Sequence, residues 1–221
     1  MNSIISHFEN IALISMEKQD GLLRRLGEHF ADFDFDEGVA RFDPGTVLPI
    51  QVLGTESDNS LTWLWAWADE HTEVSETLLR SARELKTWGT KEGLFEFTAP
   101  SFDLDPADGN MLALMATEIC SASGYYRDPY DGGAVFLLLF GAGSDRRHDL
   151  DRTGLIRAMR DLASRYDIDH RRVLSSYFAK KGLPSSGSGD TVNAELAGGE
   201  RLIARFDPAG RILTINGDSL T

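Results

Sequence analysis

The stretch Leu61-Thr62-Trp63-Leu64-Trp65-Ala66-Trp67-Ala68 contains three of the four tryptophans of this 221-residue chain. Successive side chains of a β-strand point to opposite faces, so we expect Trp63, Trp65 and Trp67 to share one face. The other face is also mostly apolar, which predicts a central strand covered on both sides. The alternative is an exposed aromatic platform for sugars, bases or proline-rich peptides, but the apolar pattern favours a place in the core.

The residues before this stretch predict further antiparallel strands. Residues 48–53 read as a strand, and the polar residues 54–60 predict the loop of a hairpin leading into the tryptophan-rich strand. Residues 33–36 and 39–42 alternate between apolar and polar side chains around a Glu37-Gly38 turn. The pattern predicts a meander of about four strands by residue 68.

Apolar residues at helical spacing predict a long N-terminal helix over residues 3–31, or two helices broken near Asp20-Gly21. A second helix is expected over residues 75–88, with Gly89 at its end. Asp105-Pro106 offers an N-cap followed by proline, which predicts a helix over residues 106–123.

Two short segments complete the expected main domain. Residues 95–98 alternate and predict an edge strand, whereas residues 125–133 are rich in tyrosine and turn formers and predict a loop. The apolar residues 134–140 that follow predict a buried strand. The expected fold class is therefore α+β, with an antiparallel sheet, a long N-terminal helix and further helices packed on it.

The character of the chain changes after residue 141. We expect a main domain over residues 1–141, a linker over 142–153 and a small C-terminal unit over 154–221, which could also pack as part of one domain. This unit should contain two amphipathic helices, a mobile Ser/Gly-rich segment over residues 184–190 and a meander of three strands.

Several segments together resemble a known family. They are Gln51–Thr55, Trp63–Ala68, Tyr125-Tyr126 and Pro129–Ala134, with the apolar run that follows. This combination resembles a bacterial family catalogued as domain of unknown function 6882, mainly over residues 48–140, and the tryptophan-rich strand is its most specific part. The resemblance implies a bacterial intracellular α+β domain. It implies no activity and no catalytic residue.

The net charge of −13 and the pI near 4.7 disfavour binding to nucleic acid. Residues 145–181 are an exception, with ten Lys and Arg against six Asp and Glu. They indicate solvated helices; the alternatives are docking onto an acidic part of this chain or of a second subunit, and nucleic-acid binding. Cys120 is the only cysteine, and the chain contains neither a signal pattern nor an apolar run of about 20 residues. We expect a cytoplasmic protein without membrane contact.

The chain lacks the sequence patterns of P-loop, Rossmann and serine-hydrolase enzymes. The five histidines show no metal-ligand spacing, so we predict neither metal nor cofactor. Carboxylate pairs such as Asp34/Asp36 and Asp69/Glu70 are candidates for acid–base chemistry, although an acidic chain contains such pairs by chance. No catalytic residue is assigned.

The best candidates for ligand or partner contact are Tyr125, Tyr126, Arg127 and Tyr130, followed by Trp63, Trp65 and Trp67 of the opening stretch. The first four combine aromatic faces, phenol groups and a cation beside a rigid strand. The alternative is that these tyrosines cover the end of the core. The sequence favours a non-enzymatic binding module whose partner is a second copy or another protein. The alternative function is a carboxylate-dependent hydrolase with its site near the tryptophan-rich sheet.

Overall fold

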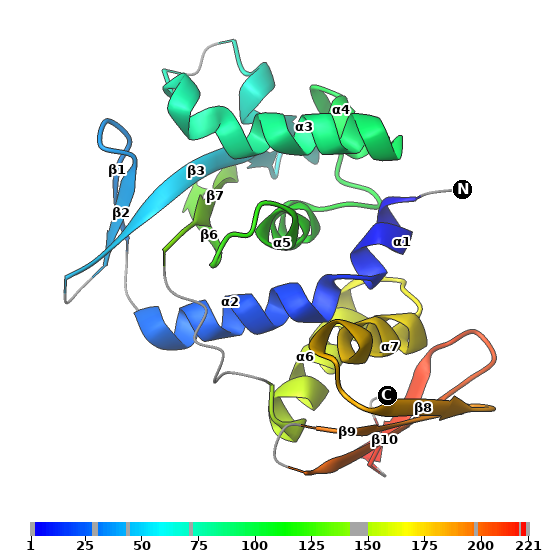
Figure 1. Cartoon of the computed structure of the whole chain (residues 1–221). Coiled ribbons are helices and arrows are strands. Elements are labelled where there is room, and N and C mark those ends of the chain that lie inside the picture. Colours follow the sequence, from blue (N-terminus) through cyan, green and yellow to red (C-terminus); the bar gives the residue numbers. More distant parts are fainter. Residues whose placement is uncertain are drawn as a thin grey trace. The chain divides into compact units, whose positions relative to one another are not determined.

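The computed structural model describes residues 3–27, 31–42, 45–70, 73–141, 150–196, 199–216 and 218–219. The chain forms two compact units (Figure 1). Unit 1 comprises Met1–Ile4 and Lys18–Asp145, and unit 2 comprises Ile5–Glu17 and Arg146–Thr221. The boundary near residue 17 falls inside helix α2 (Ala12–Leu26), so each unit takes part of that helix.

Among its described residues, unit 1 contains a seven-stranded antiparallel sheet. Its strands are β1 (Asp32–Asp34), β2 (Val39–Phe42), β3 (Thr46–Ser57), β4 (Thr62–Trp65), β5 (Ser101–Asp103), β6 (Gly124–Tyr130) and β7 (Gly133–Leu139). The 12-residue strand β3 is the centre of the sheet, because it pairs with β2, β4 and β7. The predicted hairpin of β3 and β4 is present, but residues 54–57 of its predicted loop belong to β3.

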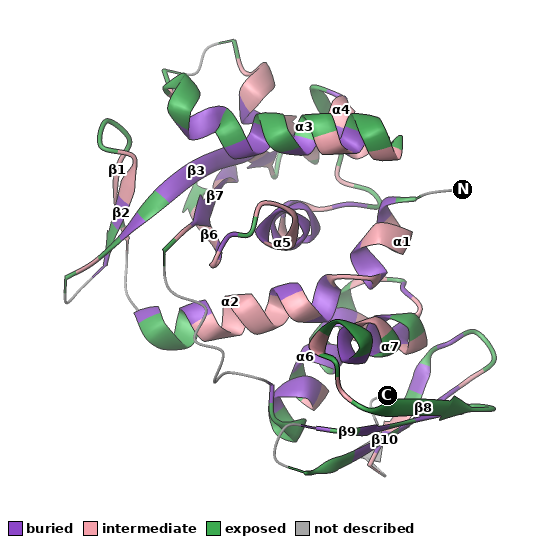
Figure 2. Ribbon diagram, in the orientation of Figure 1, coloured by how far each residue is buried: buried purple, intermediate pink, exposed green. Residues whose placement is uncertain are grey.

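The helical elements of unit 1 after α2 are the 3-10 helices η1 (Ala66–Ala68) and η2 (Glu76–Leu79), and the α-helices α3 (Arg80–Glu92), α4 (Phe95–Thr98) and α5 (Gly109–Ile119). Helix α3 packs against β3 and α4, and α5 packs against β6 and β7. Figure 2 shows that the residues between these helices and the sheet are buried. These helices give β3 and β7 an environment away from solvent.

The two faces of this sheet bury different kinds of side chain. Strand register places Trp63, Trp65 and Phe136 on one face, where the ring of Trp63 lies 5.3 Å from each of the other two. A Cβ atom on Gly54 would lie 2.7 Å from the Trp63 ring, so the backbone there has room only for glycine. The opposite face is aliphatic, with Ile50, Val52, Leu137 and Leu139 beside Leu22 and Leu26 of α2.

Unit 2 contains a second antiparallel sheet, of five strands among the described residues, in the order β12-β11-β10-β9-β8. Its elements are most of α1 (Ile4–Glu9), the start of α2, α6 (Arg152–Arg165), α7 (His170–Lys181), β8 (Ser185–Ser188), β9 (Thr191–Glu195), β10 (Arg201–Phe206), β11 (Ile212–Ile215) and β12 (Asp218–Ser219). Buried and exposed residues alternate strictly along β10, as expected for a sheet covered on one face. The α+β class is confirmed in both units.

The predicted long N-terminal helix is two helices, and the break lies at Asn10-Ile11 rather than near Asp20-Gly21. Gly21 is an interior residue of α2. The Asn10 side-chain oxygen accepts hydrogen bonds from Arg172 Nε at 3.2 Å and Ser176 Oγ at 3.3 Å, both on α7. Such contacts between residues distant in sequence are invisible to local periodicity.

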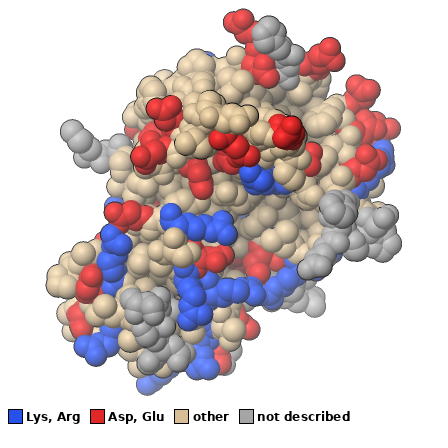
Figure 3. Space-filling model, turned by 180° about the vertical axis from the view of Figure 1, so that it is seen from behind, with Lys and Arg blue, Asp and Glu red and all other residues tan. Residues whose placement is uncertain are grey.

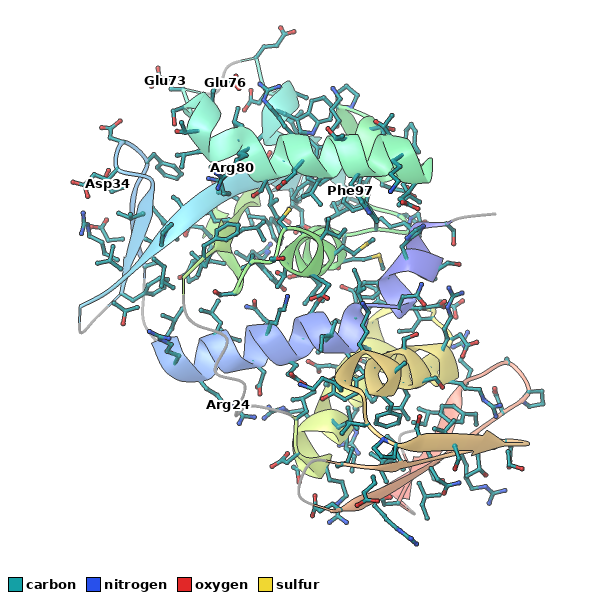
Figure 4. All side chains as sticks on the ribbon, in the orientation of Figure 1. Arg24, Asp34, Glu73, Glu76, Arg80 and Phe97 are labelled. Atoms are coloured by element: carbon teal, nitrogen blue, oxygen red, sulfur yellow. The ribbon has the colours of Figure 1, made fainter. Side chains whose placement is uncertain are left out.

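The predicted edge strand at residues 95–98 is instead the helical turn α4. Its Phe97 is fully buried beneath α3, 5.1 Å from the Trp88 ring (Figure 4). A Cβ atom on Gly89 would lie 2.2 Å from Phe97 Cβ, so Gly89 allows close helix packing and does not end α3. The helix ends instead at Gly93, whose φ of 71° is left-handed.

Helix α5 starts later than Asp105-Pro106 predicts. Its N-cap is Asp108, whose Oδ1 accepts the Met111 N–H at 2.7 Å. The predicted loop at residues 125–133 is also different, because residues 124–130 form strand β6 and pair with β7. Residues 185–188, expected to be mobile, form strand β8, and the expected three-stranded meander is part of a five-stranded sheet.

Candidate interaction site

The tryptophans proposed for ligand contact have different environments. Trp63 and Trp65 are fully buried, as the core interpretation of the opening stretch predicts. Trp65 Nε1 donates a hydrogen bond to the Glu96 carbonyl at 2.8 Å. Trp67 does not continue the strand, because the chain turns into η1 after Trp65; it is half-buried, with Lys86 Nζ 3.6 Å from its ring centroid. Trp63 and Trp65 therefore present no surface to a ligand.

The four residues of the predicted tyrosine–arginine cluster lie on β6 and alternate between its faces. Register with β7 places Tyr125 and Arg127 on the tryptophan face, and Tyr126 and Tyr130 on the aliphatic face. Tyr126 packs edge-on against Phe33 at 5.3 Å. The structure therefore brings Tyr125 and Arg127 together but separates them from Tyr126 and Tyr130.

Tyr125 and Arg127 hold the start of α5 against the sheet. Arg127 donates to Glu56 Oε1 at 3.2 Å, and Glu56 Oε2 accepts the Gly109 N–H at 3.0 Å. Tyr125 Oη donates to Asn110 Oδ1 at 3.1 Å. These contacts satisfy a buried carboxylate and one of the first N–H groups of α5. Tyr130 is more accessible, with 49% of its surface exposed.

The remaining candidates from the sequence are carboxylates and histidines. Among the described residues, no group of three His, Cys, Asp or Glu side chains could hold a metal ion. Asp34 Oδ1 accepts the Glu37 N–H at 2.8 Å, which is a turn-forming role. His29, His71 and His148 lie outside the described residues, as do residues 145–149 of the basic segment.

His170 is a buried histidine in unit 2. Its Nδ1 accepts the Ile212 N–H at 3.0 Å, and its Nε2 contacts no hydrogen-bond partner among the described residues. Burial lowers the pKa of His170, and the nearby Arg211 lowers it further. The fold thus favours the neutral form of His170, which links the start of α7 to the backbone of β11.

Strand β8 presents a free sheet edge. It pairs only with β9 among the described residues, and all four of its residues are exposed (Figure 2). The Glu195 N–H donates to the Pro184 carbonyl, and the backbone direction alternates along an antiparallel strand. The N–H and C=O groups of Ser185 and Gly187 therefore point away from β9, and no described residue bonds them.

Strand β8 lacks several of the devices that usually protect a sheet edge, although it is only four residues long and Pro184 directly precedes it. Its sequence Ser-Ser-Gly-Ser contains no charge and no proline, and its register with β9 has no bulge. A trough of about 400 Å³ lies beside this edge, over β8, β9 and β10. Two rows of side chains that run across the three strands line it. One row is Pro184, Glu195 and Arg201, and the other is Ser186, Asn193 and Ile203. In each row a small residue on β8 or just before it is followed by longer side chains on β9 and then on β10.

The Ser/Gly-rich composition of residues 184–190 predicted a mobile segment where this edge lies. A usable signal was present, because Gly189-Asp190 between Ser188 and Thr191 is a typical two-residue hairpin loop. Gly189 has a left-handed φ of 58°, which such loops require. Hydrogen bonds from Arg205 and Thr191 lower the pKa of Asp190 at the same turn.

Charge is divided unequally between the units. Unit 1 contains 23 Asp and Glu against 9 Lys and Arg, whereas unit 2 contains 12 against 13. Net charges are therefore −14 and +1. On the face shown in Figure 3, carboxylates are spread over unit 1 and Lys and Arg gather over unit 2. A partner meets little net charge at unit 2.

A model of a family of unknown function, DUF6882, matches residues 6–141. The match covers more than half of the chain, so the chain belongs to this family. No curated protein and no solved structure matches the chain. The described residues include no helix with the length and apolar character needed to cross a membrane. The β8 edge lies outside the residues that the family model matches.

Proposed function

We propose that this member of a family of unknown function is a non-enzymatic module that binds another polypeptide by strand addition at β8. The free edge of β8 carries the proposal. An incoming extended segment would pair its backbone with Ser185 and Gly187, which is a common mode of peptide recognition.

The trough beside β8 supports the same proposal. Side chains of an added strand on this face would pack beside the small residues Pro184 and Ser186, which leave room toward Glu195 and Asn193 of β9. Arg201 and Glu195 offer opposite charges to polar side chains of the partner. Backbone pairing would supply affinity, and this lining would supply selectivity.

No described contact favours the alternative hydrolase. Glu56, the buried carboxylate near the tryptophan-rich sheet, is engaged by the Gly109 N–H and by Arg127. We also propose a cytoplasmic setting, which is supported by the single cysteine, because Cys120 can form no intramolecular disulfide.

A matched pair of substitutions at Gly187 tests the proposal. Gly187→Pro removes the outward N–H of β8, whereas Gly187→Ala keeps it. A Cβ atom at this position would meet nothing closer than 3.8 Å, so Gly187→Ala should not disturb β9. Gly187→Pro removes an N–H that points away from β9, so it breaks no hydrogen bond of the β8–β9 pair. The probe is a phage-displayed library of random linear peptides, panned on the full-length wild-type chain.

Peptides enriched on the wild type should bind Gly187→Ala with similar affinity. They should bind Gly187→Pro about tenfold more weakly, because one hydrogen bond is lost and a proline ring blocks the edge. Isothermal titration of one synthetic peptide would measure both values. Equal affinity for the two variants, or no enrichment over an unrelated protein, would contradict strand addition at β8.

A further inference from the structure

We propose that the partner at this edge is a second copy of the chain, whose β8 pairs antiparallel with β8 of the first around a two-fold axis through Ser186. This inference rests on the proposed function and names its partner. Pairing would join two five-stranded sheets into one continuous sheet.

One register of antiparallel self-pairing satisfies all the outward backbone N–H and C=O groups of β8. When two residues face each other across an antiparallel pair, the backbone N–H and C=O groups of both must point toward the partner strand, or those of both must point away from it. The backbone N–H and C=O groups of Ser185 and Gly187 point outward, and those of Ser186 point toward β9. An axis through Ser186 places Ser185 opposite Gly187 of the second copy, so all the outward N–H and C=O groups of the two residues are satisfied.

The side chains of β8 permit this approach. Ser186 would face its own copy across the axis, and two serine side chains fit in a non-hydrogen-bonded pair, the closer of the two kinds. Ser185 and Gly187 are also small, and β8 contains no charged residue that would face the same charge on the second copy. Like charges placed directly opposite each other would instead oppose self-pairing.

The charge distribution favours contact between copies through unit 2. Two copies that approached through unit 1 would each present a net charge of −14, and long-range repulsion would oppose them. Unit 2, with a net charge of +1, imposes almost no such penalty. The free edge and the nearly neutral surface thus occur in the same unit.

Disulfide trapping tests this register directly. In a Cys120→Ala background, Ser186→Cys would place two thiols across the axis with Cα atoms about 4.5 Å apart, within the range that a disulfide spans. Ser188→Cys is the matched control, because it is also exposed but its two copies would lie about 13 Å apart along the strand. Dimer formation is followed on non-reducing gels.

We expect the Ser186→Cys chain to cross-link about tenfold faster than the Ser188→Cys chain, since pairing raises the effective concentration of its thiols. Gly187→Pro added to Ser186→Cys should remove the difference, and Gly187→Ala should preserve it. Sedimentation equilibrium should show a concentration-dependent dimer for the wild type and a monomer for Gly187→Pro.

Equal cross-linking rates for Ser186→Cys and Ser188→Cys, or a dimer that Gly187→Pro leaves intact, would overturn the self-pairing. If peptides from the library still distinguish Gly187→Pro from Gly187→Ala, the edge binds another polypeptide and only the identity of the partner is wrong. If that distinction is also absent, the proposed function fails with it.

Discussion

The two sheets of this molecule differ in how much of their surface is buried within their own unit. In unit 1, six of the seven residues of β7 are buried, and the tryptophan face and the aliphatic face are both covered. In unit 2, every second residue of β10 is exposed and the β8 edge is open. A strand buried on both faces has no side-chain surface left for a partner, which is why we propose the one-sided sheet of unit 2 as the interaction surface.

The largest effect that would test this contrast is expected for Trp63→Ala. Trp63 is fully buried and touches two aromatic rings, so its removal leaves a large cavity. We expect the free energy of unfolding to fall by about 3–5 kcal/mol. The remaining tryptophans, Trp65, Trp67 and Trp88, all lie in unit 1, so urea unfolding followed by fluorescence reports on this unit.

The control for Trp63→Ala is Ile203→Ala on the open face of unit 2. Ile203 is 46% exposed, and we expect a change within about 0.5 kcal/mol, measured by far-UV circular dichroism. A cost for Ile203→Ala as large as that for Trp63→Ala would show that the outer face of unit 2 is covered in solution.

A smaller effect is expected where glycine allows close packing. Gly89→Ala forces a Cβ atom against Phe97 and should destabilise unit 1 by about 1–3 kcal/mol, because the core around it is already filled. Gly187→Ala on the free edge should change stability by no more than about 0.5 kcal/mol. Thermal melts of the two variants measure the difference, and equal melting temperatures would show that α3 and α4 can separate without cost.

The third test concerns the pH dependence of unit 2. Since the folded state lowers the pKa of His170, its neutral form contributes full stability above the ordinary histidine pKa of about 6.5. That contribution is lost as the pH falls through the folded-state pKa, because a proton on Nδ1 breaks the hydrogen bond from Ile212. Urea unfolding at about pH 7.5 and about pH 5 should show unit 2 weakened by acid.

A non-titrating replacement provides the control for this pH effect. In His170→Asn, the side-chain oxygen can replace Nδ1 as the acceptor of the Ile212 N–H, so stability should depend less on pH between the two conditions. Equal losses of stability on acidification for the wild type and His170→Asn would show that His170 is not the source of the pH effect.

Much of the fold could be predicted from patterns within a single element. The apolar run that becomes β7 and the periodic segments that become α6 and α7 were assigned correctly, because burial of one face repeats at the period of the element. The α+β class followed from these elements. The core position of Trp63 and Trp65 followed from an apolar pattern on both faces.

The errors arose where distant residues decide the local structure. Residues 95–98 are helical because Phe97 fits beneath Gly89, and the pair is separated in sequence by a turn. The hydrogen bonds of Tyr125 to Asn110 and of Arg127 to Glu56 also join distant residues, so the local sequence did not predict them; contact of these two residues with a partner stays a prediction. Conversely, β8 was missed because serine and glycine disfavour strands, and pairing with β9 overrides that preference.

The division of the chain within α2 has a consequence for synthesis. Residues 5–17 leave the ribosome before residues 18–145, yet the rest of their unit is Arg146–Thr221. At about 5–20 residues per second, the two parts are made on the order of ten seconds apart. During that interval the Phe8 side chain lacks Tyr166, the ring that it contacts at 5.0 Å in the folded unit. Unit 2 can therefore fold only after the whole of unit 1 has been translated.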